Sequence, residues 1–572
     1  MSVSKLTSMI TGMEGAKLSR DDERYTYPYL GKVLKELDAA TGYTEKGGRA
    51  EIPKPTNIEN YKRVGRLHEN PVYDRPTGKI AVSVYEDAEP LIAEVKLLPM
   101  GEAKDISDYK YDNDLTDFFR RYSEENGLME LTLPEGRYLL VVSKGSEYGI
   151  VNKVVTVKAG EETKEEIKLK RFINLSAKGW YVGDLHHHSV YSSPLYPPQG
   201  TDYVYDTPKI VQMSMQAAGL TFGALSDHHN VLNHREWEKL KTDNFLPILS
   251  KEISTTNGHV LQLNVDKDVI YKIPAEEERT DEYLRNEFLR ITKEIKDNGG
   301  FPQINHPRDM QKAISFNPDY TDIIDIFDTI EIWNGSHPMW DGTTNYKAFE
   351  LWLSLLEEGR FIGATTGSDT HEVSLEFWQD SFGYIVGLRN AVREQFSSFA
   401  GELKEKAEYV LSILDSQFPL IEKWEKVNLT SGCVRTYVYA PGENGDHFAK
   451  RSPEHLLTNI KEGHSFVTNG PILIASINDK IMGETASFPV DAEQIKAELK
   501  IISNRPLKTL EVWQNGGRKE TIALPEVECE DGAYDYSGCY TFSAADAKWV
   551  FFRVYDDYTT QAITNPIFLE AI

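Results

Sequence analysis

Between residues 180 and 371, short apolar segments alternate with segments of helical periodicity. The apolar segments cover residues 180–183, 221–225, 246–249, 260–263, 301–304, 329–333 and 361–364. The helical patterns cover residues 208–218, 281–296 and 346–358, and the first is preceded by Thr207 and opened by Pro208, which suit a helix N-terminus. Because strands that alternate with helices form a parallel sheet or barrel, we expect an α/β fold with its chemistry at the carboxyl ends of the strands.

Histidines and carboxylates follow these predicted strands. The candidate metal ligands are His186, His188, Asp227, His228, Glu252, His259, His306, Asp369 and His371. On an extended chain His186 and His188 project to one side, as do Asp369 and His371. One tetrahedral ion needs fewer ligands than this set offers, so we expect two or three adjacent divalent ions with Glu252 as a bridge. Mixed imidazole and carboxylate ligands suit Zn, Mn or Fe better than Ca or Mg.

A centre of this kind predicts hydrolysis by a metal-bound hydroxide, because the ions lower the pKa of a bound water and polarise a phosphoryl or carbonyl oxygen. Four residues are catalytic candidates. Asp369 would orient the water and Glu252 would bridge the ions. His229 could protonate a leaving group, with an ordinary structural contact as the alternative. Arg308 could bind an anionic phosphate, with a surface ion pair as the alternative.

Three further residues are weaker site candidates. Glu331 and Asn334 end a predicted strand on the presumed active face. His187 would point away from His186 and His188 on a strand, so we expect it to pack or to hydrogen-bond rather than to bind metal.

At these positions the chain resembles the polymerase-and-histidinol-phosphatase (PHP) superfamily. Residues 184–189, Asp-Leu-His-His-His-Ser, resemble its first motif, and residues 226–228 resemble its second. His306 and Pro307 match the third motif, and residues 367–371, Gly-Ser-Asp-Thr-His, match the fourth. Segments 135–138, 143–148, 179–184, 463–471 and 562–567 resemble the carbaryl-hydrolase-like branch, so the resemblance extends from about residue 130 to the end of the chain.

The resemblance implies a distorted (β/α)7 barrel that holds two or three ions. It places four ligands at one ion, namely His186, His188, Glu252 and Asp369. It places four at the others, namely His228, His259, His306 and His371, with Asp227 as a ligand or a support. Pro194 stands where trinuclear relatives have a further histidine, which favours two ions. The branch is named for cleaving a carbamate ester whereas the superfamily mostly cleaves phosphoesters, so the substrate does not transfer.

The regions outside the barrel differ in pattern. Residues 1–76 are predicted to be an irregular segment, apart from a helix near residues 29–40. Period-two alternation over residues 77–172 predicts a β-sandwich. The PHP-like barrel is assigned to residues 178–476, with a helical insertion at about 390–428, and a second β-sandwich to residues 477–572.

Composition limits the partners. The net charge of -26, without a basic stripe, argues against binding to nucleic acid or to anionic membranes, which leaves a small-molecule substrate. No apolar segment reaches the roughly 18 residues of a membrane span, and no secretory signal is present, so we expect a cytoplasmic protein. Three scattered cysteines cannot make a disulfide framework or a cysteine-rich zinc site. The oligomeric state is left open.

These patterns together predict a metal-dependent hydrolase that acts on a small phosphoester. One alternative is a carboxylic or carbamate esterase with the same metal centre. A second is a non-catalytic carbohydrate- or protein-binding protein with a structural metal site, which the two flanking β-sandwiches suggest. Ligands arranged around an open coordination position would favour catalysis, whereas ions saturated by side chains would favour a structural role.

Overall fold

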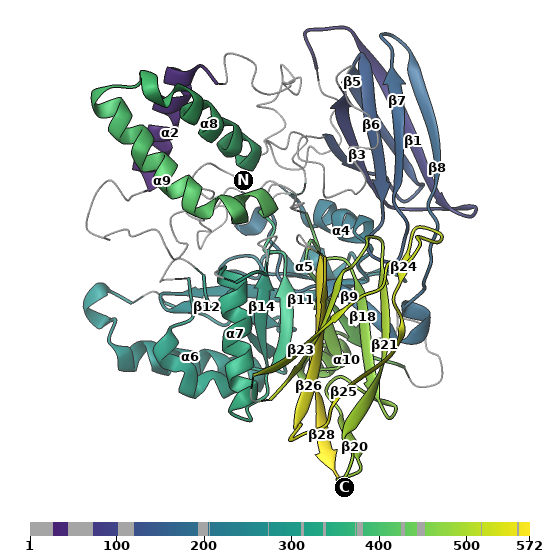
Figure 1. Cartoon of the computed structure of the whole chain (residues 1–572), viewed down its shortest axis with the longest axis vertical. Helices are drawn as coiled ribbons and strands as arrows, with labels where there is room; N and C mark the ends of the chain where they lie inside the picture. The colour runs from purple at the N-terminus through teal and green to yellow at the C-terminus, as the bar shows by residue number, and fades with distance from the viewer. Residues whose placement is uncertain are drawn as a thin grey trace.

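The computed structural model of the chain contains strand-rich and helical parts (Figure 1). It describes residues 27–43, 72–100, 119–192, 204, 206–272, 274–309, 314–335, 339–341, 343–371, 373, 381–424, 430–442, 452–515, 517–556 and 560–572. In Figure 1 the N-terminal strands and a group of three helices lie above a larger α/β part that runs into the C-terminal strands. No helix among the described residues is long and apolar enough to cross a membrane.

The N-terminal strands form two four-stranded sheets that face each other. One sheet holds β1 (Thr77–Glu86), β2 (Glu89–Pro90), β5 (Leu128–Pro134) and β8 (Glu162–Lys168). The other holds β3 (Glu94–Met100), β4 (Phe119–Tyr122), β6 (Gly136–Ser143) and β7 (Val151–Val157). Alternate residues such as Val82, Leu131 and Leu140 are buried in one core between the sheets. The period-two pattern therefore corresponds to a β-sandwich.

Seven strands of the α/β part are hydrogen-bonded side by side in chain order. They are β9 (Trp180–Asp184), β10 (Phe222–Leu225), β11 (Leu246–Thr255), β12 (Gly258–Leu263), β13 (Phe301–Ile304), β14 (Thr329–Asn334) and β15 (Gly363–Gly367). The helices between them are α4 (Pro208–Ala217), α5 (His234–Glu238), α6 (Asp281–Asp297) and α7 (Thr344–Glu357). Thr280 and Thr343 cap α6 and α7 by accepting hydrogen bonds from the backbone N–H groups of Tyr283 and Tyr346. The α/β prediction is confirmed for this part of the chain.

The expected all-parallel order is wrong at one strand. β12 is antiparallel to both β11 and β13, whereas β9, β10 and β11 are parallel, as are β13, β14 and β15. Only Thr256 and Asn257 separate β11 from β12, and so short a connection permits only an antiparallel hairpin. The reversal brings His259, at the start of β12, beside the end of β11.

Backbone hydrogen bonds join the two ends of this seven-stranded run. The N–H of Asp369 donates to the carbonyl of His186 at 2.8 Å, and the N–H of His188 donates to the carbonyl of Thr370 at 3.0 Å. The segments that follow β9 and β15 therefore lie side by side at the carboxyl ends of their strands.

The C-terminal strands extend the same sheet. β16 (Arg435–Tyr439) pairs with β9 and β17 (Ser465–Thr468), and the ladder continues through β27 (Gln561–Thr564) and β26 (Trp549–Tyr555) to β22 (Thr509–Gln514) and β23 (Arg518–Ala523). β20 (Thr485–Phe488) and β28 (Ile567–Ala571) pair beside this path. Helix α10 (Pro453–Lys461), capped by Ser452, lies between β16 and β17 in the chain.

A separate five-stranded sheet covers this extension. It contains β18 (Ile472–Ile477), β19 (Lys480–Ile481), β21 (Gln494–Ser503), β24 (Tyr534–Asp535) and β25 (Gly538–Ser543). Leu473 and Ile501 from this sheet share one core with Val512 and Phe552 from the large sheet. The C-terminal strands thus form a β-sandwich that includes β18, and one of its two sheets is continuous with β9.

Three helices pack together outside the sheets. They are α2 (Tyr27–Thr41), α8 (Ser381–Gln395) and α9 (Gly401–Trp424), grouped at the upper left of Figure 1. Val33, Leu37, Leu388 and Val410 are buried in this group. The helix expected near residues 29–40 corresponds to α2, and most of the remaining residues of the N-terminal 76 lie outside the described part.

Candidate metal centre

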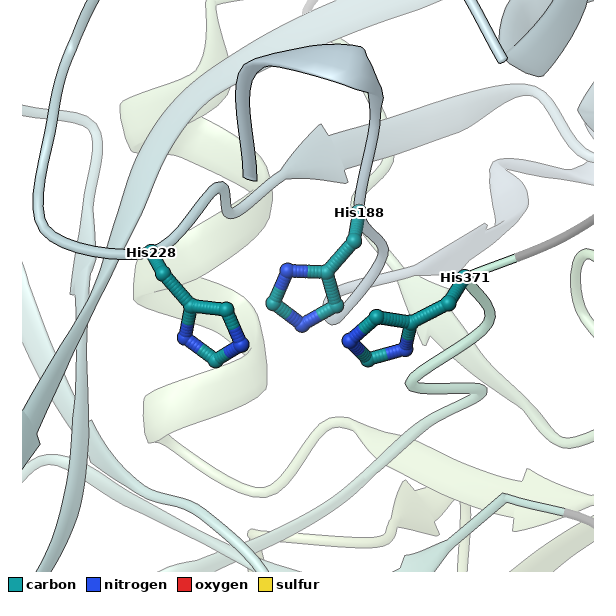
Figure 2. A group of neighbouring side chains, drawn as sticks. All are labelled: His188, His228 and His371. Carbon is teal, nitrogen blue, oxygen red and sulfur yellow. The ribbon is translucent and has the colours of Figure 1, made fainter. Parts of the chain in front are cut away.

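The predicted ligands come together at the carboxyl ends of the strands. His186 and His188 follow β9, His228 follows β10, and Glu252 lies on β11. His259 begins the reversed strand β12, His306 follows β13, and Asp369 and His371 follow β15. Figure 2 shows the His188 ring between those of His228 and His371, whose centroids lie 4.4 and 4.1 Å from its own. Segments far apart in the chain thus supply one buried cluster.

Glu252 lies at the centre of this cluster, with both carboxylate oxygens near histidine nitrogens. Its Oε1 lies 3.0 Å from His259 Nδ1, 3.2 Å from His306 Nε2 and 3.4 Å from His186 Nε2. Its Oε2 lies 3.0 Å from His228 Nδ1 and 3.6 Å from His188 Nε2. This is the position expected of a bridging carboxylate.

Asp369 is the second carboxylate of the cluster. Its Oδ1 lies 3.1 Å from His188 Nε2, 3.4 Å from His186 Nε2 and 3.7 Å from His371 Nδ1. His186 and His188 therefore lie between the two carboxylates.

The spacing of these atoms fits bound cations. The cluster contains four overlapping groups whose ligand atoms lie within 4.8 Å of one another: His188, His228 and His371; His186, His306 and Asp369; His186, His188 and Glu252; and Glu252, His259 and His306. A zinc ion with bonds of about 2.0–2.1 Å separates tetrahedral ligands by roughly 3.4 Å, which is close to the separations found around both carboxylates. His186 Nε2 and His188 Nε2 face each other at 3.2 Å, and the buried Nδ1 of His306 has no hydrogen-bond partner among the described residues. The buried histidines and carboxylates can therefore bind metal.

Electrostatic interactions hold the carboxylates ionised. Burial raises the pKa of Glu252, but the nearby His186, His259 and His228 outweigh it and hold that pKa well below its usual value. Asp369 is affected in the same way, by His186, His188 and His371. Ionised carboxylates are the form that binds metal.

The histidines divide into two kinds. Burial together with His371 and His228 holds the pKa of His188 well below its ordinary value, so its ring is neutral. Burial also lowers the pKa of His306, but Glu252, Asp369 and Glu331 raise it to about 9 overall. In the metal-free protein His306 therefore carries a proton that a cation would have to displace.

Three residues in or beside the cluster have left-handed backbone geometry. The φ angles are 60° at His229, 25° at His306 and 49° at Asp369. Such conformations cost about 1–3 kcal/mol each in non-glycine residues and are concentrated at functional sites. Each is held by a hydrogen bond from its own N–H group, to Glu252 O at 3.0 Å, Glu331 Oε2 at 2.7 Å and His186 O at 2.8 Å, respectively.

Asp227 does not join the cluster, and its geometry corrects the proposed ligand role. Its Oδ1 accepts hydrogen bonds from the Ser189 N–H at 2.6 Å and from Ser192 Oγ at 2.7 Å. Its Oδ2 accepts from Ser189 Oγ at 2.7 Å and from Asn233 Nδ2. Because these donors satisfy both oxygens, Asp227 holds the loop after His188 in place, which is the supporting role left open for it.

His187 also points away from the other histidines. Its Nε2 lies 2.8 Å from Ser431 Oγ and its Nδ1 lies 2.9 Å from the carbonyl oxygen of His188. This geometry agrees with the prediction that His187 hydrogen-bonds instead of binding metal.

The two remaining catalytic candidates lie beside the ligands. The half-buried His229 ring makes no hydrogen bond with a described residue, and burial together with His228 lowers its pKa to about 4. Arg308 donates from Nη1 to the carbonyls of Pro307 and Phe316 at 3.1 and 3.3 Å, and no carboxylate pairs with it in the described part of the chain. Pro194 lies outside the described residues.

The structure adds residues that the sequence analysis omitted or weighted weakly. The buried Glu331 lies 3.3 Å from His186 Nδ1, and Asn334 donates to it at 3.0 Å. Asn305 donates to Glu252 Oε1 at 2.8 Å. A side chain on Gly367 would collide with His186. A polar residue within an apolar strand marks Glu331 in the sequence, and Gly367 opens the fourth motif, but nothing comparable marks Asn305.

Comparisons with known proteins do not identify a family. No protein-family model and no curated protein match the chain. Two solved structures are distant likenesses of the chain. An amidohydrolase from Chromobacterium violaceum with bound sulfate and no metal is 16% identical, over 34% of this chain and 90% of that one, with a TM-score of 0.23. The minor pilin GBS52 of Streptococcus agalactiae is 18% identical, over 18% of this chain, with a TM-score of 0.14.

The chain spans half or less of some of the proteins it resembles. It covers 48% of the pilin and 19% of the Bacillus anthracis TIE protein, which is 17% identical with a TM-score of 0.13. A member of glycosyl hydrolase family 2 from Bacteroides cellulosilyticus is 10% identical, over 85% of this chain, with a TM-score of 0.18. Likenesses this weak carry no argument about function.

Proposed function

We propose that the chain is a metal-dependent hydrolase of the PHP type that acts on a small phosphoester. The observation that carries this proposal is the buried cluster of two carboxylates and six imidazoles at the strand ends. Six of its members, His186, His188, His228, His306, Asp369 and His371, come from the four PHP-like motifs, and the other two are Glu252 and His259. Strands β9–β15 lie side by side, and backbone hydrogen bonds join the segment after β9 to the segment after β15. This arrangement supports a distorted (β/α)7 barrel as the frame of the site.

The cluster would hold two divalent ions, Zn, Mn or Fe, with Glu252 among the ligands of both. One ion would be held by His186, His188, Glu252 and Asp369, and the other by Glu252, His259 and His306. The group formed by His188, His228 and His371 leaves room for a third ion as the alternative. When bound, the ions would supply Lewis acidity and lower the pKa of a coordinated water.

The charge balance favours an anionic substrate. Two divalent cations would exceed the summed charge of Glu252, Asp369 and the neighbouring Glu331, so the loaded site would be positive and attract a phosphate group. Arg308, beside His306 and without a carboxylate partner among the described residues, adds a cation that can orient such a group. The pKa of His229 is lowered to about 4, so its neutral ring can accept a proton or a hydrogen bond in the site, and the proton for the leaving group must come from elsewhere.

The decisive experiment compares two chromogenic substrates. Protein reconstituted with Mn or Zn is expected to release p-nitrophenol from p-nitrophenyl phosphate faster than from p-nitrophenyl acetate. Asp369→Asn should abolish phosphate release. Asparagine removes the charge, and it tolerates the left-handed backbone at this position better than most residues do. Asp479→Asn is the matched control, because Asp479 also has a positive φ, 63°, but is exposed between β18 and β19.

The alternatives predict different results. Turnover of the acetate alone would replace the phosphoesterase by a carboxylic or carbamate esterase, to which the carbaryl-hydrolase-like segments point. If the ions bind but neither substrate is cleaved, the metal site is structural. Equal activity of Asp369→Asn and the wild type would contradict the proposed metal chemistry.

A further inference from the structure

We infer that Glu331 is a positioning residue that fixes two metal ligands at once, His186 by its ring and His306 by its backbone. The inference rests on the proposed metal centre. Glu331 lies on β14, between β13 and β15 in the sheet, and its side chain is fully buried. It belongs to none of the four ligand groups found among the described residues. Its effect on an ion would therefore act through the residues it holds.

One oxygen of Glu331 selects the ring nitrogen that His186 offers to a metal. Glu331 Oε1 lies 3.3 Å from His186 Nδ1. An ionised carboxylate only accepts hydrogen bonds, so Nδ1 must carry the hydrogen. The proton that a metal would displace is then the one on Nε2, which faces Glu252 Oε1 and Asp369 Oδ1 at 3.4 Å each. Carboxylate partners of this kind fix the tautomer and orientation of metal-binding histidines.

The other oxygen of Glu331 holds the backbone at His306. Glu331 Oε2 accepts a hydrogen bond of 2.7 Å from the His306 N–H group. The φ angle of 25° at His306 is strained for a residue with a side chain, so this bond stabilises a conformation that the chain would otherwise avoid. The same conformation directs the His306 ring towards Glu252.

The surroundings leave the Glu331 carboxylate little freedom. Asn334 Nδ2 donates to Oε2 at 3.0 Å. Asn334 is held in turn by Asn345 at the start of α7, through hydrogen bonds of 2.9 and 3.1 Å to its backbone N–H and carbonyl. On the other side, a methyl group on Gly367 would lie 2.3 Å from Glu331 Oε1 and 2.2 Å from His186 Cβ. The absence of a side chain at Gly367 thus allows Glu331 and His186 to meet.

Glu331→Gln tests the two hydrogen-bonding roles of Glu331 while keeping the size and shape of the side chain. A glutamine of nearly the same shape can accept a hydrogen bond on one side of its amide only, because the NH2 group donates. Either the His186 ring or the His306 N–H therefore loses its acceptor. We expect the affinity for Zn, measured by competition with a chromophoric chelator, to fall about 10- to 100-fold.

Two further variants keep the test decisive. Glu331→Asp retains both acceptor oxygens but withdraws them by one methylene, so its affinity should lie between those of the wild type and Glu331→Gln. Glu511→Gln removes an equally buried carboxylate on β22, outside the cluster, and should leave the affinity for Zn unchanged. Thermal unfolding of the metal-free variants checks that each one folds.

A spectroscopic measurement reads the hydrogen bond without relying on activity. In protein with ¹⁵N-labelled histidine, the Nδ1–H proton of His186 should give a downfield, slowly exchanging signal, both with and without Zn. Glu331→Gln should shift or lose this signal, and Glu511→Gln should keep it. Unchanged Zn affinity and an unchanged signal in Glu331→Gln would overturn the inference. Failure of the wild type to bind any ion while the signal is present would overturn the proposed function and leave the hydrogen bond established.

Discussion

Gly367→Ala should damage the proposed metal centre without removing a single polar atom. Gly367 ends β15, directly before the segment that carries Asp369. The added methyl carbon would lie 2.2 Å from His186 Cβ and 2.3 Å from Glu331 Oε1. Ordinary contact distances between such atoms are roughly 3.5 Å or more, so His186 and Glu331 must each move by about 1 Å.

The size of the effect follows from this displacement. Overpacking of a buried site costs about 1–3 kcal/mol in the free energy of unfolding. Metal ligands tolerate deviations of only about 0.2 Å from their ideal distances, so a shift of about 1 Å in His186 should weaken ion binding as well. If the added methyl group destabilises the Zn-bound protein by about 1.4 kcal/mol more than the metal-free protein, the affinity for Zn falls about tenfold.

The assay combines urea unfolding of the metal-free protein with Zn competition. Gly538→Ala is the control, because Gly538 is likewise a terminal residue of a strand, the first of β25, but its nearest neighbour would be 3.9 Å from the new methyl group. The control should differ from the wild type by only a few tenths of a kcal/mol and should bind Zn normally. Wild-type stability and wild-type Zn affinity in Gly367→Ala would refute the reasoning.

Three further predictions concern other parts of the chain. Tyr122→Phe removes the hydrogen bond from β4 of the N-terminal sandwich to the Val373 carbonyl, 3.0 Å long, and should lower the free energy of unfolding in urea by about 1 kcal/mol; no change would contradict this link. Burial lowers the pKa of Lys144, which donates to the Ile92 and Gln216 carbonyls, to about 8. The unfolded chain therefore binds more protons between pH 8 and 10.5, so the free energy of unfolding should rise with pH over this range in the wild type, and the rise should be smaller in Lys144→Met. Ions at 100 times their dissociation constant should stabilise the fold by about 2.7 kcal/mol, so adding a chelator should lower the melting temperature, and an unchanged temperature would count against bound metal.

The sequence predicted local features of the fold well and the pairing of distant strands less well. Apolar strands and intervening helices are visible in the periodicity of the chain. The direction of β12 was mispredicted because a short apolar segment looks alike in parallel and antiparallel sheets, although the two-residue connection at Thr256 and Asn257 was an available signal. The pairing of β16 with β9 joins residues more than 250 positions apart in the chain, and no local pattern specifies it.

The candidate site shows the same division. His186, His188 and Asp369 were predicted from their spacing on extended segments, and the structure brings them together. The position of Asp227 depends on Ser189, Ser192 and Asn233, whose hydrogen bonds leave no periodic trace in the sequence. The contact of Glu331 with His186 arises because the segments around β14, β15 and β9 meet, which requires the three-dimensional fold.

The metal content of the reconstituted chain tests the central claim most directly. After removal of metal, incubation with Zn or Mn and desalting, elemental analysis should find two ions per wild-type chain. Glu252→Gln should retain fewer, because Glu252 lies within 3.6 Å of nitrogen atoms from five histidines and bridges the two proposed ion positions. A wild-type chain that holds no ion, or equal metal content in Glu252→Gln and the wild type, would contradict the account.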